Sequence, residues 1–337
     1  MKVKIIIFLA VLLFLLFFLM IKSPKENFIQ QDFHHLGLDS AMLYTSYHTI
    51  DAKNSDRKIA FPPSFLTAYL QNTTRDSLLL FGYRCSQSDT AGFFSHYQSL
   101  PAMIKNLLNQ KLIGIYFYEN LLIDGFLHTI YNRTDKYYVI VCNKKILNKD
   151  LSEYLSDKEN SRFVPSSYRI NVNIADTTLN AFFYVLLHEY FHIFDFENKL
   201  SIPFDELTDC SKNISSFVTK YWRYPTTPQE TAFNNHYLIG DLYNKVSNKL
   251  IDSSFVVPIY TELSNGNFAS YYSTTSYAED VAEYLALYYI TQCLKSDYTI
   301  EVYHEAENLL FYRPYENQRL LKRFGDLPKN VQSLLIK

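Results

Sequence analysis

The feature that most constrains the fold of this chain is a predicted helical segment whose first half is apolar on every side. Residues 179–197 contain neither glycine nor proline, and residues 181–187 (AFFYVLL) are apolar all round. A helix of this kind is stable only where other elements surround it. Asp176, Thr177 and Thr178 are candidates for its N-terminal cap. We therefore predict a helix over residues 179–197 at the centre of its domain.

The same segment carries two histidines and a glutamate in the motif His188-Glu189-x-x-His192. Four residues turn a helix by about 400°, so the two histidines project from one face, one turn apart. Two imidazoles placed in this way can bind one tetrahedral zinc ion, and Glu189 can reach a water molecule as its general base. Without partners, burial of these side chains would cost several kcal/mol. The alternative is that both histidines hydrogen-bond to neighbours in the core.

A second predicted helix, over residues 276–294, offers the remaining metal ligand. Glu279 and Glu283 are four residues apart and share one face of this helix. We assign Glu279 as the third ligand, and Glu283 as the carboxylate that hydrogen-bonds a ligand imidazole and selects its tautomer. Glu279 has an alternative role, because Ser276 and Glu279 also form a capping box at the helix start.

Two further acids compete for a place at this site. Asp280 follows Glu279 directly and is a weaker candidate for the third ligand. Asp195 lies seven residues after His188, on nearly the same face of the helix, where it could hydrogen-bond a ligand histidine. The alternative for Asp195 is a solvated acid near the helix end.

Together the two motifs resemble the gluzincin branch of zinc metallopeptidases, because His188-Glu-x-x-His192 is followed by Glu279-x-x-Ala-Glu283. The second motif is more similar to the anthrax lethal factor type than to the thermolysin type. The resemblance covers residues 165–295 and implies an α+β, zincin-like fold with a small mixed sheet and an active-site helix. It also implies Zn²⁺ as the cofactor and a protein or peptide as the substrate.

The resemblance assigns one more residue to the site. Tyr272 lies seven residues before Glu279, at the position where the lethal factor-like pattern has a tyrosine that stabilises the tetrahedral intermediate. It therefore implies an oxyanion role for Tyr272. The competing explanation is chance, because the chain has 29 tyrosines and Tyr271 is adjacent.

The sequence pattern predicts several other elements. Residues 101–109 read as a helix, and residues 113–118 and 137–141 as strands rich in β-branched and aromatic side chains. Residues 168–174 alternate between apolar and polar side chains, as in a half-exposed strand. An edge strand near the cleft of zincins commonly pairs with an extended peptide, and residues 168–174 are one candidate for that edge.

The N-terminus contains an unbroken apolar run, residues 5–21, with lysines on both sides. As a helix this run is about 25 Å long, a little less than the ~30 Å hydrocarbon core of a membrane. We predict an uncleaved transmembrane signal-anchor, so that the rest of the chain is exported to a periplasmic or extracellular space. The alternative is a cleaved signal peptide and a secreted protein, although no small-x-small cleavage site follows the run. The predicted divisions are residues 1–25, an N-terminal segment 26–98 of unclear role, and a catalytic domain 99–337.

Charge and composition exclude several other classes of protein. The formal net charge is -2 and no long basic run occurs, which argues against nucleic acid as a partner. No GxGxxG or GxxxxGK[ST] motif is present for phosphate binding. Cys85, Cys142, Cys210 and Cys293 form no CxxC pair, so they are either free thiols or members of two disulfides.

These patterns predict a membrane-anchored zinc metalloendopeptidase-like hydrolase, in which a zinc-bound water activated by Glu189 cleaves peptide bonds. A second hypothesis is a catalytically silent, zincin-like module with a binding or structural role in the envelope. A third is a zinc amidase or other hydrolase that acts on a non-peptide bond, because the motif suits any attack of water on a carbonyl group.

Overall fold

The computed structural model describes most of the chain, namely residues 47, 58–73, 80–89, 97–132, 135–201, 215–224, 227–228 and 250–335. The chain divides into two compact units. One consists of Met1–Asp51 and Ile130–Tyr137, of which Tyr47 and the ends of two neighbouring strands are described. The other consists of Ala52–Thr129 and Tyr138–Lys337, and the following description concerns this second unit.

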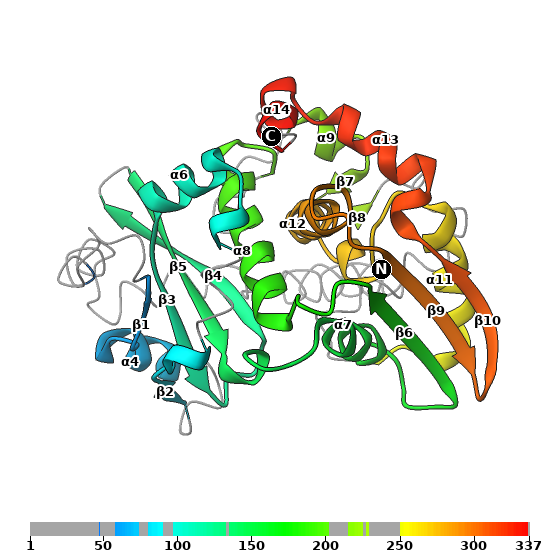
Figure 1. Ribbon diagram of the computed structural model, residues 1–337, viewed down its shortest axis with the longest axis horizontal. Helices are drawn as coiled ribbons and strands as arrows, with labels where there is room; N and C mark the ends of the chain where they lie inside the picture. Colours follow the sequence, from blue (N-terminus) through cyan, green and yellow to red (C-terminus); the bar gives the residue numbers. More distant parts are fainter. Residues whose placement is uncertain are drawn as a thin grey trace, which may run out of the picture. The chain divides into compact units, whose positions relative to one another are not determined.

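The described residues form a mixture of helices and small sheets, as the sequence predicted (Figure 1). The strands are β1 (Ile59–Ala60), β2 (Phe81–Tyr83), β3 (Leu112–Glu119), β4 (Gly125–Asn132), β5 (Asp135–Asn143), β6 (Tyr168–Ile174), β7 (Trp222–Tyr224), β8 (Thr227–Pro228), β9 (Tyr298–His304) and β10 (Glu307–Tyr312). The α-helices are α4 (Ser64–Thr73), α6 (Ala102–Lys111), α7 (Leu151–Asn160), α8 (Ala181–Glu197), α9 (Ser216–Thr219), α11 (Val256–Asn265), α12 (Tyr277–Tyr288), α13 (Gln318–Asp326) and α14 (Lys329–Leu335). The short helices are η3 (Lys144–Ile146), η7 (Ser253–Phe255), η8 (Tyr272–Thr274), η10 (Pro314–Glu316) and the π-helical turn η9 (Tyr289–Cys293), which continues α12.

A five-stranded mixed sheet forms the support for α8. Its order is β1-β3-β5-β4, with β2 also paired to β3. Strand β3 runs parallel to β1 and β5 and antiparallel to β2. The predicted strands at 113–118 and 137–141 are confirmed as parts of β3 and β5. The segment 26–98, which had no predicted role, contributes β1 and β2 to this sheet.

Helix α8 packs closely on this sheet, and every residue from Ala181 to Asp195 is buried, as the apolar pattern predicted. The rings of Phe117 and Phe182 meet edge to face, with their centroids 5.2 Å apart. A Cβ atom on Gly125 would lie 2.8 Å from Val185 Cγ1. Glycine is therefore needed at this position because the helix approaches the strand so closely.

The start of α8 differs slightly from the prediction. The helix begins at Ala181, and its cap is Asn180, whose side chain accepts a hydrogen bond of 2.9 Å from Phe183 N–H. Asp176 instead accepts a bond of 2.9 Å from Thr178 N–H and closes the preceding turn. Asn and Asp cap helices about equally well, so the side-chain chemistry alone does not choose between them.

A three-stranded antiparallel sheet of order β10-β9-β6 forms the second layer. Strand β6 has the predicted limits, and Ile170, Val172 and Ile174 face the core. Its position at the end of the strand order agrees with an edge strand.

The outer backbone groups of β6 are nevertheless occupied by α7. Ser152, Ser156 and Asn160 are spaced four residues apart on one face of α7. Their side chains bond successive outward N–H groups of the strand: Ser152 Oγ accepts from Ile174 (2.9 Å), Ser156 Oγ from Val172 (2.8 Å) and Asn160 Oδ1 from Ile170 (2.9 Å). Asn160 also donates to the Ile170 carbonyl group, at 2.6 Å. The expectation that β6 pairs with an extended peptide is therefore wrong, because α7 already takes the place of the next strand.

Some predictions concern residues that lie outside the described part. The apolar run 5–21 is one of them, and Cys210 is another. Among the described residues, no helix has both the length and the hydropathy of a membrane span. Cys85, Cys142 and Cys293 are free thiols, so no disulfide joins these three to one another.

Removal of the two α7 hydroxyls should destabilise the fold. We expect the double variant Ser152→Ala/Ser156→Ala to lose about 1–3 kcal/mol of unfolding free energy, because two backbone N–H groups lose their partners. Urea unfolding measures this loss. Ser161→Ala is the matched control, because Ser161 is exposed and its hydroxyl donates to the Lys158 carbonyl group at 2.8 Å. The effect of this substitution should stay within about 0.5 kcal/mol. Equal stability of the double variant and the wild type would contradict the role given to this contact.

Candidate metal centre

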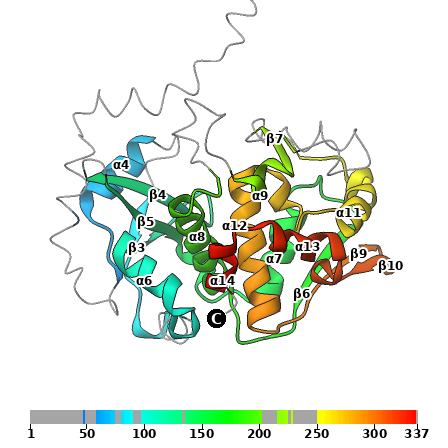
Figure 2. The same cartoon turned by 90° about the horizontal axis from the view of Figure 1, so that it is seen from above.

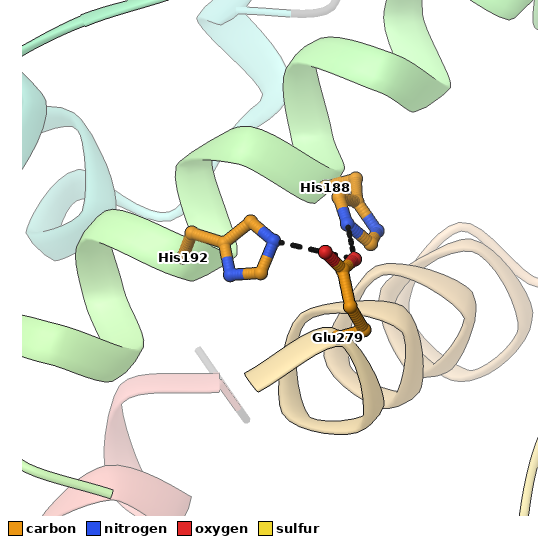
Figure 3. A group of neighbouring side chains, drawn as sticks. All are labelled: His188, His192 and Glu279. Carbon is orange, nitrogen blue, oxygen red and sulfur yellow. Dashed lines mark hydrogen bonds and ion pairs between the residues drawn. The ribbon is translucent and has the colours of Figure 1, made fainter. Parts of the chain in front are cut away.

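Helices α8 and α12 pack side by side (Figure 2) and bring the two predicted motifs together. Glu279 Oε2 lies 3.1 Å from His188 Nε2 and 3.6 Å from His192 Nε2. Figure 3 shows the two imidazoles and the carboxylate directed toward one another from the two helices. One potential ligand atom from each residue lies within 4.8 Å of the other two. These three residues could therefore hold one metal ion.

Glu279 takes part in both the helix cap and the histidine cluster, through its backbone N–H in the first and its carboxylate in the second. Ser276 Oγ accepts a hydrogen bond of 3.2 Å from Glu279 N–H, so Ser276 caps α12 as predicted. The Glu279 carboxylate does not close a capping box, because it points toward the histidines. Burial alone would raise the pKa of Glu279, but hydrogen bonds from His188 and His192 hold it well below its ordinary value.

The cluster attracts positive charge. Burial alone would lower the pKa of His188, but the hydrogen bonds and charges of Glu279 and Glu283 raise it to about 9. A site that stabilises a proton so strongly on an imidazole is also one that favours a cation in the same place.

Glu189 is the general-base candidate, and it is buried beside the cluster. Burial raises its pKa, whereas the charges of His192 and His188 act in the opposite direction. Its Oε2 atom is buried and has no hydrogen-bond partner among the described residues. A buried carboxylate oxygen without a partner is costly. A cation in the cluster and the water around it would supply that partner, so the residues present fit a metal ion.

Glu283 occupies the position predicted for the residue that orients a ligand imidazole. Its Oε2 lies 3.2 Å from His188 Nδ1, within the distance of an ion pair. It also accepts hydrogen bonds from Ser270 Oγ (2.8 Å), Lys158 Nζ (3.4 Å) and the Tyr184 hydroxyl. Burial alone would raise the pKa of Glu283, but the charge of Lys158 and these contacts lower it to about 2. An ionised Glu283 favours the tautomer of His188 with the proton on Nδ1 and leaves Nε2 free for the cluster.

Tyr272 joins the same group of residues. Its ring centroid lies 5.9 Å from that of His188. Burial raises its pKa well above the ordinary value, and so do the charge of Glu279 and a hydrogen bond to it. The neighbouring Tyr271 is a core residue, with its ring 5.7 Å from Phe163. The structure thus brings Tyr272, and not Tyr271, to the candidate metal centre.

The two competing acids have other partners, and the hypotheses that they join the site are wrong. Asp280 is fully buried and accepts bonds of 2.9 and 2.7 Å from the two terminal nitrogens of Arg323 and one of 2.8 Å from Trp222 Nε1. Asp195 accepts a bond of 2.7 Å from Ser201 N–H and another from its hydroxyl, which closes the loop after α8.

Arg323, which neutralises Asp280, is enclosed by aromatic rings. The guanidinium carbon lies 4.4–5.8 Å from the ring centroids of Phe217, Tyr221, Phe268 and Tyr284. Its side chain has no exposed surface. Aromatic faces attract cations, so this cage lowers the cost of burying Arg323 beneath α12.

Sequence reasoning missed two residues of the site. Tyr184 precedes His188 by four residues, so its place on the same face of α8 was accessible from helical periodicity. Lys158 had no such signal. It comes from α7, and its place depends on the way α7 lies along β6.

Comparisons of the chain with protein-family models, with curated proteins and with solved structures find no match.

Metal binding should stabilise the fold through the histidines of α8. At a Zn²⁺ concentration about one hundred times the dissociation constant, we expect the unfolding free energy to rise by about 2.7 kcal/mol. His192→Ala should abolish this rise, whereas His304→Ala should retain it, because His304 lies on β9 and packs against the Tyr168 ring. Urea unfolding with and without zinc gives the measurement. An equal rise in the His192→Ala protein would place the metal elsewhere.

Proposed function

We propose that this protein is a zinc-dependent metallopeptidase that hydrolyses peptide bonds. One observation carries the proposal: a buried carboxylate oxygen of Glu189 has no hydrogen-bond partner among the described residues, and Glu189 interacts electrostatically with His188, His192 and Glu279. Two imidazoles and one carboxylate are a known ligand set for catalytic zinc, which leaves a fourth position open. Calcium and magnesium prefer sets made of oxygen atoms alone, so they fit this cluster less well.

The charge of the site also favours a divalent cation. Glu189, Glu279 and Glu283 carry three negative charges when ionised, and Lys158 supplies one positive charge beside them. A divalent cation would supply the remaining two. Buried charges that lack such compensation destabilise a fold.

The residues around the cluster can perform the proton transfers of amide hydrolysis. A bound zinc ion would supply the Lewis acidity for attack of water on the scissile carbonyl group. The Glu189 carboxylate would accept the proton of the attacking water and return it to the leaving amine. The Tyr272 hydroxyl would donate a hydrogen bond to the oxygen on which negative charge develops. Glu283 would hold His188 in its orientation.

Two features of the fold support the proposal: α8 lies on a small mixed sheet, and the later helix α12 supplies the glutamate. Because α7 occupies the outer side of β6, we propose that an extended peptide lies instead along residues 125–129 of β4. Strand β4 ends the strand order of the sheet beneath α8.

The N-terminal run at 5–21 adds a cellular setting to the proposal. If this run is a signal-anchor, the peptidase is tethered to a membrane and acts on proteins or peptides in an exported compartment. Cleavage of the run would release the same enzyme in secreted form. Protease-protection of the membrane-bound, full-length chain tests this orientation.

The general-base role of Glu189 is tested by Glu189→Gln. We expect this variant to retain zinc and to lose peptide hydrolysis by about 10²–10⁴-fold, the contribution of a positioned base. The assay is turnover of a broad fluorogenic peptide library, with metal content measured in parallel. Glu307→Gln, an exposed glutamate on β10, is the control and should keep wild-type activity.

Three outcomes would contradict the role of Glu189 or favour another function. If the wild type hydrolyses peptides and Glu189→Gln is equally active, the assignment of Glu189 is wrong. Bound zinc without turnover of any peptide favours the catalytically silent envelope module. Products released only from non-peptide amides favour the zinc amidase.

A further inference from the structure

Lys158 makes contacts that an ordinary surface lysine does not make. Its Nζ lies 3.7 Å from the centre of the Tyr272 ring, 3.4 Å from Glu283 Oε2 and 3.2 Å from the Tyr184 hydroxyl. The side chain is only 12% exposed. An ammonium group is costly to remove from water, and it remains buried only where its partners compensate.

The backbone beneath Tyr272 is already fixed without Lys158. Tyr272 begins η8, and the hydroxyl groups of Ser270, Ser273 and Thr275 bond within this turn. These bonds hold the main chain but not the side-chain torsions of Tyr272. The orientation of its ring therefore depends on the hydrogen bond to Glu279 and on what contacts the ring face.

Two cations, Lys158 on α7 and Arg162 two residues after the helix ends, lie over the Tyr272 ring. Lys158 is the nearer, and the guanidinium carbon of Arg162 lies at 5.7 Å from the ring centroid. A cation against an aromatic face is attracted by the ring, most strongly when both are removed from water. It also withdraws electron density, which makes the phenol hydroxyl a stronger hydrogen-bond donor.

The position of Lys158 is set by the contact between α7 and β6. Ser156 and Asn160 flank it in sequence, and both side chains are bonded to the β6 backbone. Lys158 therefore points away from the strand, on a helix that cannot easily rotate or slide.

We infer that Lys158 is a positioning residue of the candidate metal centre: its ammonium group holds the Tyr272 ring so that the hydroxyl is directed at the metal cluster. This inference rests on the proposed function, in which Tyr272 stabilises developing negative charge. Lys158 touches none of the three residues that would bind the metal, and it acts through Tyr272. Glu283 keeps its other hydrogen-bond donors, Ser270 and Tyr184, when Lys158 is removed.

A double-mutant cycle tests the coupling between Lys158 and Tyr272. We expect Lys158→Met to lower kcat about tenfold with little change in KM, and to cause no further loss in a Tyr272→Phe background. Zinc affinity, measured by calorimetry, should stay within about threefold of the wild type. Lys144→Met is the matched control. Lys144 also contacts a carboxylate, Glu119, and a tyrosine ring, Tyr83, away from the site.

A second readout does not require turnover. Acetohydroxamate, a small anionic metal ligand, is titrated into the zinc-loaded proteins. Lys158→Met, Tyr272→Phe and the double variant should all weaken its binding by about the same factor, as expected for residues that act as one unit. Lys158→Gln, which keeps an amide donor near Glu283 without the charge, replaces Lys158→Met if that protein does not fold.

The outcomes separate this inference from the proposed function. A zinc-loaded wild type that hydrolyses no amide refutes the proposed function, while the acetohydroxamate cycle still tests the coupling. Full activity and full acetohydroxamate affinity in Lys158→Met overturn the inference. Two other results would also overturn it. In one, the losses caused by Lys158→Met and Tyr272→Phe add in the double variant; in the other, the loss of zinc affinity equals the loss of kcat. Either result means that Lys158 supports the fold or the metal and not Tyr272.

Discussion

The packing of α8 against α12 is the contact on which the rest of the site depends. It buries two imidazoles and the carboxylates of Glu189 and Glu283, and it partly buries that of Glu279. Groups of this kind remain buried only when each finds a partner. Their partners come from the opposite helix, from Lys158 on α7 and, in the proposed function, from a divalent cation. The stability of this interface therefore depends on how the charges of the cluster are compensated.

Helix α7 connects the second sheet to the metal cluster. One face of α7 replaces a neighbouring strand for β6, and another carries Lys158 to Tyr272 and Glu283. The same helix therefore closes a sheet edge and completes the surroundings of the metal cluster. A rotation of α7 would break its bonds to the edge of β6 and would also move the Lys158 charge away from Tyr272 and Glu283.

The sequence predicted what depends on local periodicity. The positions of α8, α12 and β6, and the placing of His188 and His192 on one face of α8, follow from spacings of two and four residues. The meeting of these histidines with Glu279 was predicted from the ligand set that catalytic zinc requires. It did not predict what depends on partners far along the chain. Helical geometry alone left Asp280 as a candidate ligand, because no feature of the sequence near Asp280 indicates that it pairs with Arg323. Alternation identified β6 as half exposed, but it gave no sign that α7 covers the strand's backbone.

The cage around Arg323 has a consequence for the order in which the protein takes shape during synthesis. Asp280 and its guanidinium partner are separated by 43 residues. Until α13 has emerged from the ribosome, the start of α12 carries an acid with no counter-charge in the interior, and that turn is poorly held. Glu279 belongs to the same turn. A nascent chain would therefore present its histidines well before it could close a complete metal site.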